Sequence, residues 1–169
     1  QSIIDSHWHY LYQLSHNKID DENESVWKWL PYGPFSSCEE MKKFYYNLFS
    51  FSNIEGFIIF ERNKNLPIGV IALKNIEYVM QKCEIGHLWY GVDYQKTKIN
   101  TESIYLIINY LMNELFFRKI MWKCDKNNKE SNRCAKRLGF DMEGIFHQDQ
   151  IVKNKNKDTI WYGITDKKW

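Results

Sequence analysis

Proline, glycine and cysteine are scarce in this chain of 169 residues, which holds 3, 8 and 4 of them respectively. The cysteines are Cys38, Cys83, Cys124 and Cys134, and no two of them have Cys-x-x-Cys spacing. No histidine lies at zinc-finger spacing from them, so the sequence predicts no bound metal. We expect reduced, buried thiols and a cytoplasmic location.

The chain also lacks a strong excess of charge and a long apolar run. Its 23 basic and 21 acidic residues give a formal net charge of +2. Nucleic-acid binders usually show a clear basic stripe, so we expect no nucleic-acid partner. No apolar run approaches the roughly 20 residues that cross a bilayer, and no signal peptide is visible, so we expect no membrane partner. Because the chain begins with Gln1, a leader or a first strand of the fold could precede it.

Apolar and aromatic side chains are abundant. They make up 44% and 17% of the chain, which argues against disorder. The length favours one domain, residues 1–169, with a substantial core. The clearest element is a helix over Thr101–Phe116, in which the apolar residues 104, 107, 108, 111, 112 and 115 form one stripe.

Periodicity, capping residues and turn residues predict the other elements. The expected helices are 5–16, a helix that Ser37 and Glu40 cap and that ends near Phe49, and 128–138. The expected strands are 57–60, 67–73, 79–90, 119–124, 142–150 and 159–164, with an acidic loop at 20–24 and a solvated polar turn at 153–157. Antiparallel strands come first, and strand, helix, strand, helix and two strands follow. We therefore predict an α+β fold around a mixed sheet.

The most informative segment is 83–140, because a strand leads through a tight polar loop into the start of a helix. A helix N-terminus offers unpaired N–H groups and a partial positive charge, and it therefore holds phosphates well. A loop that enters such a helix directly after a strand suits a pyrophosphate. This pattern favours a nucleotide-bearing cofactor. The alternative is an ordinary loop with solvated lysines.

Several short motifs within and around this segment, taken in order and spacing, resemble the GCN5-related N-acetyltransferase (GNAT) superfamily and its ribosomal-protein serine acetyltransferase branch. The motifs are 29–34, Glu84-Ile85-Gly86, 95–100, Thr101-Glu102, Asn128-x-x-Ser131, Leu138-Gly139-Phe140 and Glu143-Gly144. The resemblance covers nearly the whole chain. It implies a mostly antiparallel sheet flanked by helices, with a splayed central strand that binds the cofactor.

The same resemblance implies acetyl-CoA as the cosubstrate. An N–H near Leu88 or Trp89 would polarise the thioester carbonyl and stabilise the developing oxyanion. We expect Asn128 to cap the helix that it begins, and the resemblance also places it beside the pantetheine arm. Lys98 and Asn100 stand where the family has small residues, which leaves the cofactor affinity open. The residues implied around the pyrophosphate are Gln95, Lys96, Thr97, Lys98, Ile99, Asn100 and Thr101.

For catalysis, the resemblance implies Ser131 as the acid that protonates the leaving thiolate. The tyrosine that many family members use is replaced by Ala135. The alternative for Ser131 is a first-turn hydroxyl that bonds to the backbone. The branch's glutamate is replaced by Gln150, so we expect Glu84 or Asp149 to act as the base through water. Glu84 anchoring the sheet is the alternative, and Asp149 would need a bulge to face the site.

The acceptor side is less specific. Trp29, Tyr32, Phe35 and His87 are the candidate acceptor-binding residues, together with Trp27. A packed aromatic core and a structural histidine are the alternatives.

The leading hypothesis is an N-acetyltransferase in which a primary amine attacks acetyl-CoA directly in a ternary complex. The amine is a protein N-terminus or a small molecule, and the sequence indicates neither which one nor an oligomeric state. A non-catalytic CoA-binding or regulatory module is the second hypothesis. A structural or interaction domain without the cofactor is the third.

Overall fold

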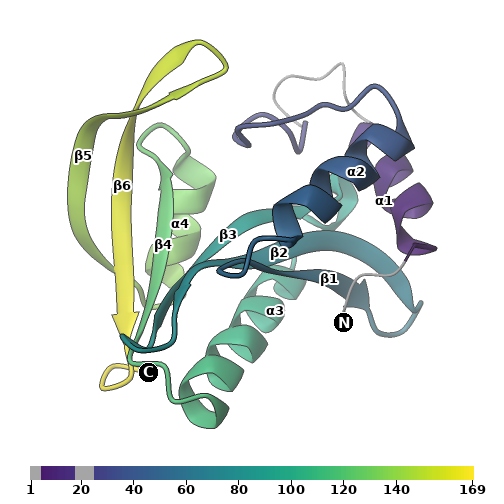
Figure 1. Cartoon of the computed structure of the whole chain (residues 1–169). Helices are drawn as coiled ribbons and strands as arrows, with labels where there is room; N and C mark the ends of the chain where they lie inside the picture. Colours follow the sequence, from purple (N-terminus) through teal and green to yellow (C-terminus); the bar gives the residue numbers. More distant parts are fainter. Residues whose placement is uncertain (1–4, 18–24) are drawn as a thin grey trace. The chain divides into compact units, whose positions relative to one another are not determined.

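The computed structural model describes residues 5–17 and 25–169, and the predicted acidic loop at 20–24 lies outside them. The described part of the chain forms helices α1 (His7–His16), α2 (Cys38–Phe49), α3 (Lys98–Asn109) and α4 (Lys129–Arg137) (Figure 1). Its strands are β1 (Glu55–Glu61), β2 (Leu66–Glu77), β3 (Lys82–Tyr90), β4 (Lys119–Asp125), β5 (Asp141–Val152) and β6 (Lys155–Thr165). A short 3-10 turn covers Val92–Tyr94, and one π-helical turn covers Tyr110–Glu114.

The strands form one six-stranded sheet in the order β1-β2-β3-β4-β6-β5. β1 and β2 are antiparallel, as are β4 with β6 and β5 with β6. β3 and β4 are parallel, with Lys82–Ile85 in register with Lys119–Trp122. The prediction of a mixed, mostly antiparallel sheet with helices is therefore confirmed.

The chain divides into two compact units. The first unit contains the described residues up to Leu73 together with His87–Asn100, and the second contains Lys74–Gly86 together with Thr101–Trp169. Among the described helices, none has the length and apolar character needed to cross a membrane.

An aromatic core holds the first unit together. Residues of α1 and α2 pack there with three strand residues, and the fully buried members include Trp8, Leu11, Trp27, Met41 and Tyr45. α2 begins where the sequence predicts, because the Ser37 side chain accepts the Glu40 N–H at 3.1 Å. The Glu40 carboxylate accepts the Ser36 N–H instead of that of Ser37. These contacts satisfy N–H groups at the helix start that have no intrahelical partner.

α3 starts at Lys98, three residues before the predicted start at Thr101. The difference arises from the residue that caps the helix, because asparagine is a good cap and Asn100 is therefore the natural candidate from the sequence. Thr97 Oγ1 instead accepts the Ile99 N–H at 3.3 Å, so Thr97 precedes the helix. The apolar stripe is largely confirmed, since Ile104, Ile108 and Leu111 are buried. The prediction that Leu115 belongs to this stripe is wrong, because Leu115 follows the π-helical turn and is 42% exposed.

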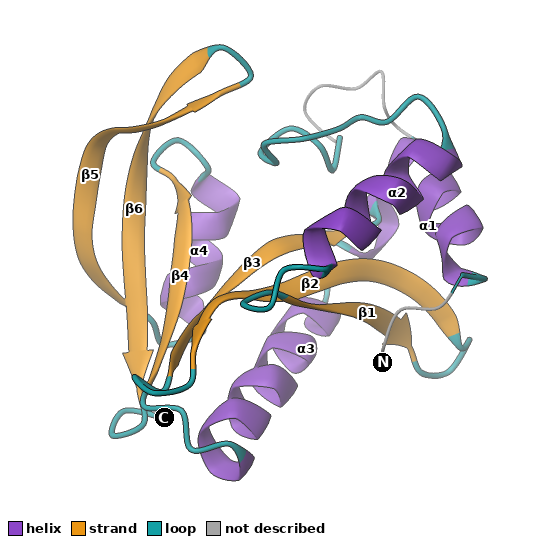
Figure 2. Cartoon of the chain, in the orientation of Figure 1, coloured by secondary structure: helices purple, strands orange, loops and turns teal. Residues whose placement is uncertain are grey.

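Two other predicted boundaries were wrong. β2 runs on to Glu77, and a turn at 78–81 occupies the predicted start of the third strand. The turn between β5 and β6 consists of Lys153 and Asn154 alone, while the predicted turn reached 157 (Figure 2). Lys153 and Asn154 have φ values of 50° and 60°, as in the two-residue turns whose twist matches a hairpin.

Candidate functional site

The loop that leads into α3 is held by its own hydrogen bonds. The Tyr94 N–H donates to the Gly91 carbonyl at 2.8 Å, and the Gln95 N–H donates to Val92 at 3.1 Å. The Gln95 side chain bonds back to the Tyr90 carbonyl at 3.2 Å. These bonds fix the loop before it enters the helix.

Three main-chain N–H groups follow in this loop, those of Lys96, Thr97 and Lys98. Within the described residues, none of the three has a hydrogen-bond partner. The Lys96 backbone has a φ of 58°, and the side chains of all three residues are exposed. Successive N–H groups at a helix start form an anion-binding concavity. Lysine at position 98 leaves this row of donors intact, because its helical backbone keeps the side chain outside the loop.

Thr101 and Arg137 meet in the second unit, where the Arg137 guanidinium donates to the Thr101 hydroxyl. Arg137 is the last residue of α4, so the contact brings a fixed positive charge to the first turns of α3. Sequence reasoning missed Arg137. Its signal was weak, since a basic residue in the last turn of a helix is common for electrostatic reasons alone.

The second half of β3 has an unusual backbone and belongs to the first unit. His87 has a φ of 48°, a left-handed conformation that only a few per cent of non-glycine residues adopt. A residue of this kind bends a strand, as the predicted splayed cofactor strand requires. Leu88 is half-buried, and the Trp89 side chain is 3% exposed. Trp89 therefore offers only its main chain to a ligand.

Three hydrogen bonds connect Trp89 to His87 through two tyrosines. The Trp89 indole N–H donates to the Tyr45 hydroxyl at 2.8 Å, and Tyr45 donates to the Tyr32 hydroxyl at 3.3 Å. Tyr32 Oη and His87 Nδ1 are 3.1 Å apart, and the two rings stack with centroids 5.6 Å apart. Burial and the neighbouring Tyr45 hold the pKa of Tyr32 well above its usual value.

The other two candidate acceptor residues differ in exposure. Phe35 is 8% exposed and packs edge-on against Trp27 at 5.2 Å, which is the core arrangement named as the alternative. Trp29 is half-buried, and the Lys28 ammonium lies 5.3 Å from its ring centroid. Tyr32 and His87 are thus the polar, half-buried end of an otherwise apolar cluster.

In the second unit, Ser131 lies in the first turn of α4. Asn128 caps this helix by accepting the Ser131 N–H at 3.0 Å. The Ser131 hydroxyl accepts the Trp122 indole N–H at 3.0 Å. The same hydroxyl also hydrogen-bonds the Cys124 thiol, so its oxygen accepts from Trp122 while its proton is directed toward Cys124. Ala135, where the family tyrosine would stand, is fully buried.

Glu84 is enclosed by donors. Its carboxylate lies 2.9 Å from Lys74 Nζ and 2.9 Å from Lys123 Nζ, and it accepts from the Asn75 amide at 3.0 Å. Only 1% of the side chain is exposed. A carboxylate with three donors is suited to anchoring strands, and this geometry favours the anchoring alternative over the role of a base.

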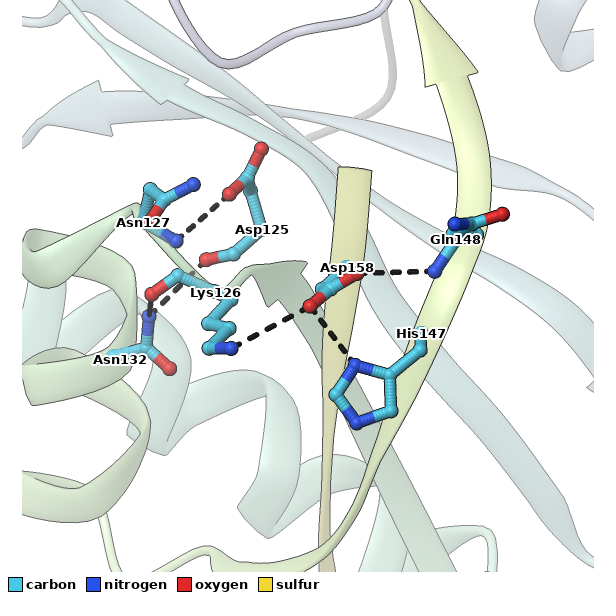
Figure 3. Close-up of polar contacts among 7 residues, drawn as sticks. All are labelled: Asp125, Lys126, Asn127, Asn132, His147, Gln148 and Asp158. Carbon is cyan, nitrogen blue, oxygen red and sulfur yellow. Dashed lines mark hydrogen bonds and ion pairs between the residues drawn. The ribbon is translucent and has the colours of Figure 1, made fainter. Parts of the chain in front are cut away.

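Asp149 lies on β5 beside a cluster that sequence reasoning did not assemble. A bulge interrupts the register between Phe146 and Gln150, which was the condition set for Asp149 to change face. Both Asp149 and Gln150 are exposed. The ordered groups here are His147 and Asp158, 3.0 Å apart, with Lys126 3.5 Å from Asp158 (Figure 3). Only the spacing of a bulged hairpin brings them together, and no local motif encodes that spacing.

No group of three or more metal-binding side chains occurs among residues 5–17 and 25–169. The free cysteines include Cys83 and Cys124, and burial raises the pKa of these thiols to about 12 and about 11. A thiol with a raised pKa stays protonated and unreactive at neutral pH.

Comparison with known proteins gives one family and several relatives. The profile of the acetyltransferase (GNAT) domain matches residues 9–141. The chain is 29% identical over 106 residues to the ribosomal-protein-serine acetyltransferase of Escherichia coli, a match that covers 63% of this chain and 58% of that protein. The chain therefore matches less than two thirds of the length of that relative.

Solved structures extend the likeness over the whole chain. A probable GNAT-family acetyltransferase from Chromobacterium violaceum superimposes with a TM-score of 0.90 at 26% identity, covering 98% of this chain and 82% of the other. A spermidine N-acetyltransferase from Vibrio cholerae, solved with CoA and spermine, has a TM-score of 0.80 at 16% identity, covering 99% and 95% of the two chains. The latter identity supports the fold alone.

Proposed function

The chain belongs to the GNAT acetyltransferase family, and we propose that it moves an acetyl group from acetyl-CoA to a primary amine. This membership confirms the resemblance found in the sequence. The reaction we propose is direct attack of the amine on the thioester within a ternary complex. The observation that carries the proposal is the row of unpartnered N–H groups at Lys96, Thr97 and Lys98.

We propose that these N–H groups bind the pyrophosphate of acetyl-CoA. Each would donate to a phosphate oxygen, and the start of α3 would add the positive end of its dipole. In the first unit, the further cofactor residues are Gln95, Ile99 and Asn100 of the loop and the main chain of Leu88 and Trp89. In the second unit they are Thr101, Asn128 and Ser131.

The chemical step needs a neutral amine and a proton for the departing sulfur. The amine lone pair attacks the carbonyl carbon, the N–C bond forms, and the C–S bond breaks. Ser131 would support protonation of the sulfur by turning its hydroxyl proton, which Trp122 orients, from the Cys124 thiol to the leaving sulfur. A free thiol has a pKa near 8.5, so modest acid assistance is sufficient.

Two acceptor classes fit the relatives. The E. coli relative is named for a serine of a ribosomal protein, and the V. cholerae structure contains a polyamine. In this chain, Tyr32 and His87 place polar atoms at the edge of an aromatic cluster, and this arrangement suits an amine carried on a partly apolar group. Trp29, which is half-buried, is the further candidate acceptor residue.

A second candidate function is a CoA-binding module without catalysis. Gln150 and Ala135 favour it, because neither can serve as the base or acid that the family motifs provide at those positions. Such a module would bind acetyl-CoA and release no thiol.

Thermal unfolding with and without acetyl-CoA tests cofactor binding, because a ligand that binds only the folded state raises the midpoint. A thiol-release assay with N-terminal peptides and small amines then tests catalysis. A raised midpoint with thiol release supports the enzyme. A raised midpoint without release against every amine supports the module, and an unchanged midpoint at saturating acetyl-CoA contradicts both.

A further inference from the structure

The hairpin of β5 and β6 contains a three-residue bulge opposite a single residue. Phe146 is in register with Thr159, and Gln150 is in register with Lys157. His147, Gln148 and Asp149 therefore lie opposite Asp158 alone. Gln148 has a φ of 53°, so the bulge includes a left-handed residue. Bulges of this kind redirect side chains and are frequent beside active sites.

Asp158 organises this bulge with both carboxylate oxygens (Figure 3). Oδ1 accepts the Gln148 N–H at 3.0 Å, and Oδ2 lies 3.0 Å from His147 Nδ1. Lys126 Nζ approaches the same Oδ2 at 3.5 Å. The Gln148 N–H and His147 hold the pKa of Asp158 below its usual value, so the carboxylate is ionised at neutral pH.

An ionised carboxylate can only accept, so it selects one form of the neutral His147 ring. The proton lies on Nδ1, where it is donated to Asp158. Nε2 then carries a lone pair. An imidazole fixed in this tautomer by a carboxylate is prepared to take up a proton at Nε2. The His147 side chain is 71% exposed, so a ligand can reach it.

The pair is tied to the turn that starts α4. The Lys126 N–H donates to the Asp158 carbonyl at 2.9 Å. The Asn132 amide donates to the carbonyls of Asp125 and Lys126 at 3.2 and 3.4 Å (Figure 3). It also donates to the Asn128 carbonyl at 2.7 Å. The same turn carries Asn128, which caps Ser131. Two independent contacts thus hold the His147 pair and the Ser131 helix to one short segment of the second unit.

We propose that His147, oriented by Asp158, accepts the proton that the acceptor amine loses. This inference rests on the proposed acetyl transfer. As the N–C bond forms and the C–S bond breaks, the proton of the attacking nitrogen passes to His147 Nε2, and His147 then returns it to water. The leaving sulfur takes its proton separately, so the overall products are an amide and a free thiol.

The charged groups around His147 fit this role. Asp158 of β6 faces Nδ1 and stabilises the imidazolium that forms, while Lys126 of the β4–α4 turn contacts the far side of the same oxygen. Asp149 lies two residues further along β5. Glu84 is committed to Lys74 and Lys123, and Gln150 has no proton-accepting group of suitable basicity.

The test compares His147→Gln with wild type, using thiol release as a function of pH and acetyl-CoA binding by thermal shift. His9→Gln is the matched control, since His9 is an exposed histidine of α1 in the first unit. We expect the kcat of His147→Gln to fall by about a hundredfold, within the range typical of general bases. The decrease of kcat/KM at acidic pH that wild type shows should be absent in this variant. The rise in melting temperature that acetyl-CoA produces should be unchanged. His9→Gln should match wild type in kcat, in the pH dependence of kcat/KM and in the acetyl-CoA thermal shift.

Two further variants separate catalysis from a structural role. Imidazole added to His147→Ala should restore part of the rate. Asp158→Asn should lower kcat, while the thermal shift that acetyl-CoA produces should stay close to that of wild type. An active wild type whose rate and pH profile are reproduced by His147→Gln overturns the inference alone. A wild type that binds acetyl-CoA and acetylates no amine overturns the proposed function, and the inference with it.

Discussion

Trp122 of β4 donates its indole N–H to the hydroxyl of Ser131 of α4 at 3.0 Å. Because an indole nitrogen can only donate, this bond fixes the Ser131 oxygen as the acceptor, and the hydroxyl proton is directed toward the Cys124 thiol. Trp122 is 5% exposed and contacts the Phe140 ring, with centroids 5.9 Å apart. A rigid residue thus holds a candidate catalytic group in one orientation.

Ser131→Ala should lower turnover by about tenfold or more, since it removes a proton donor that acts on the leaving sulfur. The N–H of residue 131 stays capped by Asn128, so the helix and the acetyl-CoA affinity should be kept. Thiol release at saturating substrates and the acetyl-CoA thermal shift measure the two effects. Unchanged turnover would show that Ser131 serves only the first turn of α4.

Trp122→Phe should lower kcat by several-fold with little change in the KM for acetyl-CoA. Phenylalanine keeps the contact with Phe140 but cannot donate to Ser131, so the hydroxyl gains rotational freedom. The double variant with Ser131→Ala should be no slower than Ser131→Ala alone, because Trp122 acts through Ser131. Additive losses in this cycle would contradict a positioning role.

Arg137→Ala should weaken acetyl-CoA binding by about tenfold, the usual effect of losing a hydrogen bond to a charged group. The side chain already lies against Thr101 at the end of the candidate pyrophosphate loop. Calorimetric titration at low and high salt measures the effect, which should shrink as salt rises. Lys136→Ala, the exposed neighbour, is the control and should bind as wild type does.

Glu84→Gln should destabilise the second unit by about 3 kcal/mol, because two lysines lose a buried counter-charge. The amide cannot neutralise Lys74 and Lys123, which both lie 2.9 Å from the carboxylate. Urea unfolding measures this loss. At a temperature where the variant is folded, kcat should stay close to wild type. A large loss of kcat would restore Glu84 as the base.

Asp158 should contribute to stability in a pH-dependent way. Its folded-state pKa lies below the usual 3.8, so its contribution is present above that value and is lost as the pH falls through the folded-state pKa. The gap between wild type and Asp158→Asn in urea midpoint should therefore be full at pH 7 and should narrow in acid. A gap that stays constant down to the acid limit would exclude the ionised carboxylate as its source.

The sequence predicted those elements whose signals are local. The apolar stripe of α3, the Ser37 cap of α2 and the Asn128 cap of α4 follow from residues within one or two turns of each other. The family resemblance added the expectation of a mostly antiparallel sheet with a splayed central strand. Errors arose where two signals competed, as at the start of α3, where Thr97 and Asn100 are both good caps.

Contacts between distant residues could not be predicted in the same way. His147 and Asp158 are eleven positions apart and meet only because three residues bulge opposite one. Arg137 of α4 contacts Thr101 of α3 across 36 positions of the chain, and Glu84 finds its lysines on two other strands. Spacing along the chain carries no information about such pairs until strand register and helix packing are known.

The hydrogen bonds that connect Trp89, Tyr45 and Tyr32 all donate in one direction, toward His87. Trp89 can only donate and Tyr45 donates to Tyr32, whose oxygen also lies within hydrogen-bond distance of His87 Nδ1. Tyr32 thus joins the buried core to the half-buried His87, and its loss would take from the Tyr45 hydroxyl the oxygen that accepts its hydrogen.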